Sequence, residues 1–282
     1  MNATFSILLP VYKSCFLQEC IDSIMTQTYA HWELIIVNDA SPESSAIDAL
    51  IHQYKDKRIQ YSTNQQNIGA LHVVRQWNLC LSYAKGDYVI CMGDDDKLHP
   101  HCLATYANLI ARYPDVDIFH GQTDIIDENG KVIRHTAIRP EKESAMSLLY
   151  GRTYRYHHQF IGDFCFQRKK LQAAGGFYYL PYAWGSDEIS SVRAAEEHGI
   201  ANTKDVVFYY RDNDGSITRH PHTFGKLKAT LLEAKWIRNF LLKPVQNTID
   251  KDYQKTLQRY LIRNTLRKCY YIVYHSISSR KA

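Results

Sequence analysis

Apolar runs of strand length alternate with segments of helical periodicity along the first third of the chain. The expected strands lie at residues 5–11, 32–37, 59–62 and 88–92, and the expected helices between them at 14–28, 46–54 and 70–84. In the first of these helices, Leu17, Ile21 and Ile24 recur at the spacing of one helical face. Alternating strands and helices are typical of a parallel, doubly wound sheet, so the pattern predicts a Rossmann-like α/β fold.

The rest of the chain continues this pattern and then becomes wholly helical. Further strands are expected at residues 116–120, 164–167 and 206–210, and further helices at 100–113 and 185–198. Asn129–Gly130 predicts the turn of a β-hairpin. Beyond Phe224 the sequence is helical, basic and aromatic. We therefore expect one α/β domain over residues 1–224, followed by a C-terminal helical extension over residues 225–282.

Three of the expected strands are followed by hydrogen-bonding residues. Tyr12 follows the first strand, Asp39 the second, and Asp94–Asp96 the fourth. In a doubly wound sheet the carboxyl ends of the strands share one edge, and ligands bind beyond that edge. We therefore expect these residues to converge on one ligand site.

The adjacent carboxylates of Asp94, Asp95 and Asp96 indicate a metal site. Their mutual repulsion makes burial costly without a counter-charge. A hard divalent cation held by oxygen ligands neutralises them and keeps open positions for phosphate oxygens. The alternative is a solvated acidic loop, which the position directly after an apolar strand disfavours.

Cysteine spacing and the N-terminus both indicate a cytoplasmic protein. The seven cysteines are scattered and form no CxxC pair, which favours free thiols over disulfides or a zinc site. The N-terminus has neither the basic nor the apolar region of a signal peptide. No run reaches the roughly 18 consecutive apolar residues of a transmembrane helix.

A series of motifs occurs in a recognisable order. They are SILLPVY at 6–12, QTY at 27–29, ELIIVNDAS at 33–41, AKGDY at 84–88, DDDKLHP at 94–100, GGF at 175–177, GSDE at 185–188, and YR with GSI at 210–217. Together they resemble the family-2 inverting glycosyltransferases of the GT-A fold, of the bacterial surface-polysaccharide type. The resemblance covers about residues 4–220 and implies a donor half at about 1–115 and an acceptor half at about 116–224.

This resemblance implies the transfer of a hexosyl or N-acetylhexosaminyl group. The donor would be a nucleoside-diphosphate sugar, here a UDP-sugar, and the acceptor a hydroxyl of a glycan or lipid-linked glycan. Mn²⁺ or Mg²⁺ would neutralise the diphosphate leaving group.

The resemblance also assigns the donor site. Pro10, Val11 and Tyr12 would line the nucleobase pocket, with Tyr12 stacking on the base. Asp39 would accept the uracil imide N–H, which favours uridine over bases that lack this donor.

Two further groups complete the implied donor site. Asn67 and Gly69 would shape the pocket floor. Asp94 and Asp96 would form the D-x-D pair, with Asp96 on the metal and Asp94 and Asp95 on ribose, donor sugar or metal-bound waters.

Asp187 matches the position of the family's catalytic base. An inverting transfer needs a carboxylate that removes the proton of the acceptor hydroxyl. The alternative role for Asp187 is to cap the following helix. Trp184 would stack on the acceptor sugar or belong to the core. Glu188, Arg211 and His220 are candidates for the acceptor or diphosphate.

The sequence departs from the family pattern at several positions. Ser186 stands where the family often has Glu, Trp77 where an Arg is usual, and Gly93 at the first acidic position of the longer pattern. The Trp77 departure leaves open which arginine contacts the diphosphate.

Three other classes of protein compete with this interpretation. A sugar-nucleotide pyrophosphorylase is disfavoured because no Gly-rich basic loop follows the first strand. An inactive sugar-nucleotide-binding scaffold is disfavoured by the intact Asp39, Asp96 and Asp187. A dehydrogenase is disfavoured by the absence of GxGxxG after an early strand.

Charge is concentrated in the C-terminal segment. Of the 34 Lys and Arg residues, 13 lie from Lys226 onward, against 3 of the 29 Asp and Glu. Such a basic, aromatic segment either rests peripherally on the anionic inner face of the cell membrane or packs on the body or on a second copy of the chain. We expect no nucleic-acid partner: nucleic acid is a poorer option, because the body is acidic and carries no nucleic-acid-binding motif.

Overall fold

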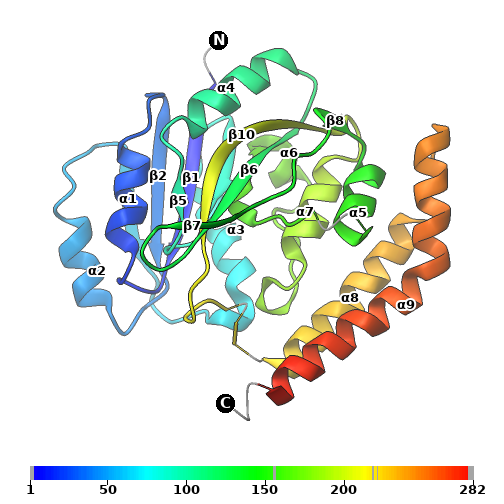
Figure 1. The fold of residues 1–282 in the computed structure, drawn as a ribbon. Coiled ribbons are helices and arrows are strands. Elements are labelled where there is room, and N and C mark those ends of the chain that lie inside the picture. The colour runs from blue at the N-terminus through cyan, green and yellow to red at the C-terminus, as the bar shows by residue number, and fades with distance from the viewer. Residues whose placement is uncertain (1–2, 155–156, 218, 221, 279–282) are drawn as a thin grey trace.

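The chain folds into a curved central sheet with helices on both faces and two long helices against one side (Figure 1). This computed structural model describes residues 3–154, 157–217, 219–220 and 222–278. The predicted α/β fold and C-terminal helices are confirmed.

The sheet is mixed, whereas the sequence predicted a mostly parallel one. Its order is β3-β2-β1-β4-β9-β6-β10-β5, with β7 beside β6 and β8 beside β10. The strands are β1 (Phe5–Val11), β2 (Trp32–Asn38), β3 (Ile59–Thr63), β4 (Tyr88–Cys91), β5 (Lys97–Leu98), β6 (Ile118–Ile126), β7 (Val132–His135), β8 (Lys142–Glu143), β9 (Phe164–Gln167) and β10 (Ile200–Arg211). The first four run parallel, as predicted, but β9 is antiparallel to both β4 and β6. Hydrophobic periodicity locates β9 but does not reveal its direction.

The helices cover both faces because apolar residues of β1 point alternately to either side. Phe5, Ile7 and Leu9 share a core with residues of α1, α2 and α4, whereas Leu8 shares one with residues of α3, α5 and α7. The helices are α1 (Leu17–Met25), α2 (Ser44–Ile51), α3 (Val73–Tyr83), α4 (Cys102–Arg112), α5 (Ala145–Tyr154), α6 (Arg168–Ala173), α7 (Ser186–Ala194), α8 (Thr223–Phe240) and α9 (Thr248–Ser278). Short 3₁₀ turns occupy Ala70–His72, Ile161–Asp163 and Pro181–Ala183.

Local signals predicted several connections correctly, while element ends were less accurate. Gly130 has a φ of 81° in the turn between β6 and β7, which is the predicted hairpin. The strand predicted at 206–210 is the end of β10, which begins at Ile200. Polar residues 202–205 interrupt its apolar pattern where the pairing with β6 shifts register. All seven cysteines are free.

The described part of the C-terminal extension, residues 225–278, shares a hydrophobic core with the α/β domain. Phe240 of α8 and Leu257 of α9 are buried in one cluster with Leu149 of α5. Tyr253 stacks on Tyr150, with their ring centroids 4.2 Å apart.

No helix within the described ranges is long and apolar enough to cross a bilayer.

Leu257→Ala should lower the free energy of unfolding by about 2–5 kcal/mol, because it opens a cavity in this shared core. Urea denaturation followed by circular dichroism measures the loss. Leu266→Ala on the same helix is the matched control: Leu266 is 63% exposed, so its loss should be about 0.5 kcal/mol or less. Two separate unfolding transitions in the wild type would contradict the shared core.

Candidate active site

A cavity of about 970 Å³ opens beyond the carboxyl ends of β1, β2 and β4. Every site residue predicted from the sequence lines this cavity, except Arg211. Those lining residues are Pro10, Val11, Tyr12, Asp39, Asn67, Gly69, Asp94, Asp95, Asp96, Trp184, Asp187, Glu188 and His220. The predicted donor and acceptor sides therefore face one continuous space.

Asp94 holds the loop that follows β1. Its Oδ2 accepts the backbone N–H groups of Tyr12 and Lys13, both at 2.7 Å. Burial and the neighbouring Asp95 raise the pKa of Asp94 to about 6. Asp94 thus joins the loops after β1 and β4, and one of its oxygens is already engaged.

Asp95 and Asp96 turn carboxylate oxygens toward a common point above Gly93. A Cβ at Gly93 would lie 2.8 Å from Asp95 Oδ1 and 3.0 Å from Asp96 Oδ2. Their other oxygens accept N–H groups, Asp95 from the Asn213 side chain at 2.8 Å and Asp96 from the Arg211 backbone at 2.9 Å. Burial and Asp95 raise the pKa of Asp96 well above its usual range. Two hard carboxylate oxygens facing one point, one of them on a buried aspartate that needs a counter-charge, suit a divalent metal.

Arg211 has a structural role, which corrects the prediction that it contacts the diphosphate or acceptor. Its side chain is fully buried and does not line the cavity. The guanidinium donates to Glu19 at 2.9 Å, to the Asp95 carbonyl at 2.8 Å and to the Glu128 carbonyl at 2.8 Å. Position after the last strand suggested a ligand contact, but the side chain turns inward and supports the aspartate loop.

Asp39 is buried at the cavity wall and anchors the segment after β3. One of its oxygens accepts the Asn64 side chain at 2.8 Å and the Ile68 N–H at 2.7 Å. The other accepts the Gly69 N–H at 3.0 Å and the Asn67 side chain at 3.2 Å. A carboxylate offers about four acceptor positions. A nucleobase N–H would therefore share an oxygen with a donor of the chain.

Asp187 lies in the first turn of α7, half-buried at the cavity wall. The N-cap position belongs to Gly185, whose φ of 89° is left-handed, so Asp187 is not the cap. Burial raises the pKa of Asp187, and Glu188 adds to this while Arg152 opposes it. The Gln159 side chain donates to Asp187 Oδ2 at 3.4 Å. A carboxylate with a raised pKa, open to a cavity, is suited to accept a proton.

Four charged side chains from four helices meet beside Asp187. Lys268 of α9 contacts both oxygens of Glu233 of α8, at 3.0 and 2.9 Å. Glu188 of α7 lies 3.4 Å from Arg152 of α5 and 4.0 Å from Lys268. Both carboxylates are buried, and burial raises the pKa of Glu233 to about 7. This four-residue charge cluster connects the C-terminal helices to the helix that carries Asp187.

The cluster also reaches the turn that precedes Asp187. A Cβ at Gly185 would lie only 2.6 Å from Glu233 Oε1, so the carboxylate packs directly on this backbone. A side chain at position 185 would be strained both by this contact and by its left-handed φ.

Trp184 and His220 lie where the end of the sheet meets α8. The Lys226 ammonium is 4.6 Å from the Trp184 ring centroid and donates to the His220 carbonyl at 2.6 Å. Lys13 donates to the Gly215 carbonyl on the donor side of this segment. The segment after β10 is therefore tied to both sides of the cavity.

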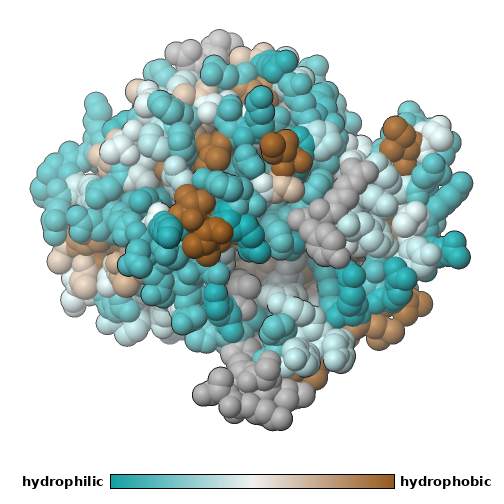
Figure 2. Space-filling view, in the orientation of Figure 1, coloured by the Kyte–Doolittle hydropathy of each residue, from teal (hydrophilic) through white to brown (hydrophobic). Residues whose placement is uncertain are grey.

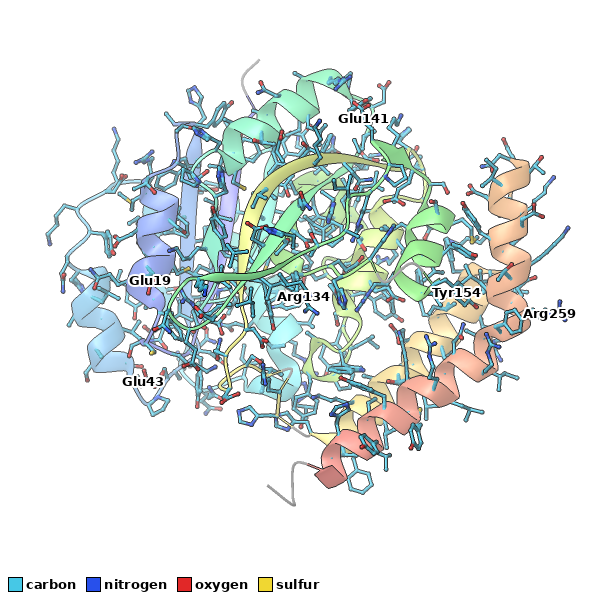
Figure 3. The ribbon with its side chains drawn as sticks, viewed as in Figure 1. Glu19, Glu43, Arg134, Glu141, Tyr154 and Arg259 are labelled. Atoms are coloured by element: carbon cyan, nitrogen blue, oxygen red, sulfur yellow. The ribbon has the colours of Figure 1, made fainter. Side chains whose placement is uncertain are left out.

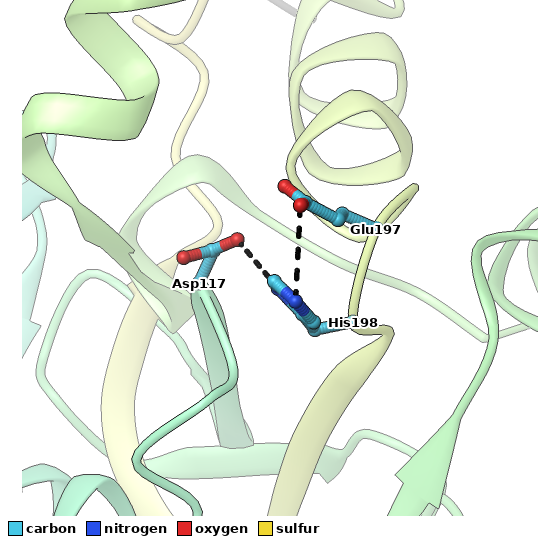
Figure 4. Close-up of side chains that lie close together, drawn as sticks. All are labelled: Asp117, Glu197 and His198. Atoms are coloured by element: carbon cyan, nitrogen blue, oxygen red, sulfur yellow. Dashed lines mark hydrogen bonds and ion pairs between the residues drawn. The ribbon is translucent and has the colours of Figure 1, made fainter.

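A second acidic group, away from the cavity, is a poorer metal site. In the described chain, Asp117, Glu197 and His198 form the one group of three ligand-type side chains close enough to share an ion (Figure 4). Lys170 already places its ammonium 2.9 Å from Glu197 and 3.8 Å from Asp117. His198 Nδ1 lies 3.1 Å from Asp117. The lysine supplies the counter-charge that these carboxylates need.

The sequence model of glycosyl transferase family 2 matches residues 6–172. This chain belongs to glycosyl transferase family 2. It is 33% identical over 138 residues to an uncharacterized glycosyltransferase of Rickettsia bellii, covering 48% of this chain and 19% of the relative. An uncharacterized glycosyltransferase of Methanocaldococcus jannaschii is 31% identical over 141 residues, 49% of this chain and 47% of the relative. The O-antigen biosynthesis protein RfbC of Myxococcus xanthus is 30% identical over 128 residues, 44% of this chain and 10% of the relative.

The chain spans less than half the length of each of these family-2 relatives.

Solved structures show the same GT-A fold. Residues 1–349 of S. aureus TarS in complex with UDP-GlcNAc align with a TM-score of 0.68 at 16% identity, covering 91% of this chain and 72% of that fragment. The mannosyltransferase PcManGT of Pyrobaculum calidifontis, in complex with GDP-Man and Mn²⁺, aligns with a TM-score of 0.60 at 15% identity, covering 99% of this chain and 76% of that one. At these identities the likeness establishes the fold alone.

Sequence reasoning missed the residues that the C-terminal helices bring to this family-2 site. Glu233, Arg267, Lys268 and Tyr271 all line the cavity. One signal was present: Glu233 is one of only three acidic residues from Lys226 onward. An isolated acid in a basic helix indicates a specific partner.

Lys268→Met should lower the free energy of unfolding by about 1–3 kcal/mol, because it leaves the buried carboxylates of Glu188 and Glu233 without one of their counter-charges. This range is smaller than for a fully buried ion pair, because Lys268 is half-exposed and water screens its charge. A carboxyl whose folded pKa is raised favours the folded state when protonated, so the loss should be greater at about pH 8 than at about pH 5.5. Urea denaturation at both pH values measures this.

Two variants control that test. Glu233→Gln in the Lys268→Met background should recover part of the loss, because it removes one unpaired charge. Lys255→Met, at an exposed position on the same helix, should have little effect. An equal loss for Lys255→Met and Lys268→Met would rule out the cluster as the cause.

Proposed function

We propose that this family-2 protein transfers a sugar from a UDP-sugar to a hydroxyl of a glycan or lipid-linked glycan, with inversion at the anomeric carbon. The observation that carries the proposal is the single cavity that contains both the Asp94–Asp96 loop and Asp187. A metal-binding loop at one wall and a carboxylate of raised pKa at the other match the two needs of this reaction. The cysteines, all free, fit a cytoplasmic location.

On this proposal Asp95 and Asp96 hold Mn²⁺ or Mg²⁺, and Asp94 positions the loop after β1. The sequence led us to expect Asp94 and Asp96 as the metal ligands. We now propose Asp95 in place of Asp94, because Asp94 already accepts two backbone N–H groups. When bound, the cation would neutralise the diphosphate. Asp94 would keep the Tyr12–Lys13 backbone against the nucleotide.

Asp187 acts as the base in this proposal. Its carboxylate would take the proton of the acceptor hydroxyl as that oxygen attacks the anomeric carbon from the face opposite the diphosphate. Gln159 would orient the carboxylate, and the Arg152 charge opposes the rise in its pKa and so favours the ionised form. Trp184 and Glu188 would border the acceptor.

Uridine is the proposed base because Asp39 offers an acceptor for the imide N–H at the end of β2. TarS was solved with UDP-GlcNAc and PcManGT with GDP-Man, so nucleoside-diphosphate sugars occupy this fold with either base. Both oxygens of Asp39 already accept hydrogen bonds from the chain, so the preference for uracil over guanine has to be measured directly.

UDP should bind with an affinity that rises at least about tenfold when Mn²⁺ is added, because the cation screens phosphate from the aspartates. Isothermal titration measures this, with GDP as the comparison nucleotide. The metal effect should weaken as the pH falls, because protons compete with the cation for the Asp96 carboxylate, whose pKa is raised well above its usual range by burial.

Asp96→Asn should abolish the metal effect, and Asp115→Asn, an exposed site elsewhere, should not. Folded protein that binds GDP but not UDP would overturn the uridine assignment, and binding of neither would overturn the donor site.

Asp187→Asn should reduce turnover at least about a hundredfold while leaving UDP affinity within about threefold, because the base acts on the acceptor and not on the nucleotide. UDP release from a panel of UDP-sugars measures turnover. In the wild type, turnover should fall as pH drops through the raised pKa of Asp187. Unchanged turnover in Asp187→Asn would exclude this residue as the base.

A further inference from the structure

The outer face of α9 carries a stripe of exposed apolar side chains. Ile262 is 77% exposed, Leu266 63%, Tyr270 70% and Val273 39%. Their spacing places them on one side of the helix, and the buried Leu257 and Ile272 lie on the other. Figure 2 shows apolar side chains along the edge of the molecule where Figure 1 places α9. Helix faces of this kind mark interaction surfaces.

A row of cations runs beside the apolar stripe. Lys255, Arg259, Arg263 and Arg267 recur every four residues and are all exposed. No Asp or Glu occurs between residues 253 and 278. Figure 3 shows Arg259 extending away from the body of the protein. Within the described ranges, none of these four cations forms an ion pair with a carboxylate.

We infer that this face of α9 binds an anionic lipid surface. The apolar stripe would enter the boundary between headgroups and acyl chains, with Tyr270 at the polar interface. The adjacent guanidinium groups would contact lipid phosphates. Long basic side chains reach such a surface readily while their stems cover apolar neighbours.

The charge pattern favours a lipid surface over a second copy of the chain. Two α9 helices packed face to face would bring their basic rows together, and no Asp or Glu occurs between residues 253 and 278 to compensate. Like charges oppose that contact, whereas an anionic surface is complementary to the whole row.

The same helix connects this surface to the cavity. Lys268 and Tyr271 line the cavity, Leu266 and Tyr270 lie in the stripe, and Arg267, the last residue of the basic row, borders both. A bilayer on the outer face of α9 would therefore lie beside the acceptor side. This second step rests on the proposed function and narrows the acceptor to a glycan tethered to lipid. Lipid binding itself does not depend on catalysis.

Flotation with lipid vesicles tests the surface. The full chain should bind phosphatidylcholine vesicles that contain about 30% phosphatidylglycerol and should bind pure phosphatidylcholine at least about tenfold more weakly. Ile262→Ser with Leu266→Ser should weaken binding to the anionic vesicles at least about tenfold. The matched control is Val132→Ser with Ile133→Ser on β7, where the side chains are 39% and 53% exposed; it should bind like the wild type.

The charge contribution is tested separately. Arg259→Glu with Arg263→Glu should weaken binding to anionic vesicles at least about tenfold and reduce its dependence on salt. Lys57→Glu with Lys204→Glu changes net charge equally at exposed sites elsewhere and should have a much smaller effect. This pair keeps the test decisive if the serine variant fails to fold.

UDP titration of the α9 variants separates this inference from the proposed function. Neither the serine pair nor the glutamate pair on α9 changes a residue that lines the cavity. Normal UDP binding with lost flotation would support the lipid surface. The inference would be overturned if the wild type ignores anionic vesicles, if it binds neutral vesicles equally well, or if sedimentation shows a dimer that the serine variant dissociates.

Discussion

The buried guanidinium of Arg211 is the contact on which the active-site geometry depends. It joins the end of β10 to the Asp95 carbonyl, to Glu19 on α1 and to the turn between β6 and β7. The Arg211 backbone N–H also binds Asp96. A charge fully removed from water must be surrounded by such partners, and one of them is the backbone of the Asp94–Asp96 loop itself. Arg211 thus holds in place Asp95 and Asp96, the two carboxylates that we propose as ligands of a divalent metal ion.

Sequence reasoning predicted that the residues after β1, β2 and β4 lie together, and they line one cavity, because the signals there are local. Apolar runs mark the parallel strands, and the polar residues directly after them converge at the strand ends without any long-range information. The position of Asp94–Asp96 after β4 is an example. Gly93, which seemed a departure from the family pattern, has a steric explanation: a Cβ there would crowd the two carboxylate oxygens.

The features that the sequence did not reveal depend on contacts between distant segments. The direction of β9 is set by pairing with both β4 and β6, which periodicity does not encode. The inward direction of the Arg211 side chain and the hydrogen bonds to Asp39 depend on contacts with residues distant in the sequence, such as Glu19 and Asn64, and residue type alone does not reveal them. Glu233 and Lys268 are 35 residues apart, and only the packing of α8 on α9 brings them together.

The charge cluster beside Asp187 also has a consequence for the order of synthesis. Glu188 and Glu233 are made before Lys268, so a growing chain holds both carboxylates without the lysine that serves them. Glu188 can pair with Arg152 before then, but Glu233 lacks its hydrogen-bonding partner until α9 arrives, so its carboxylate has little reason to pack against the turn at Gly185 earlier. The wall of the cavity that carries Asp187 would therefore be the last part of the protein to mature, after its sheet had formed.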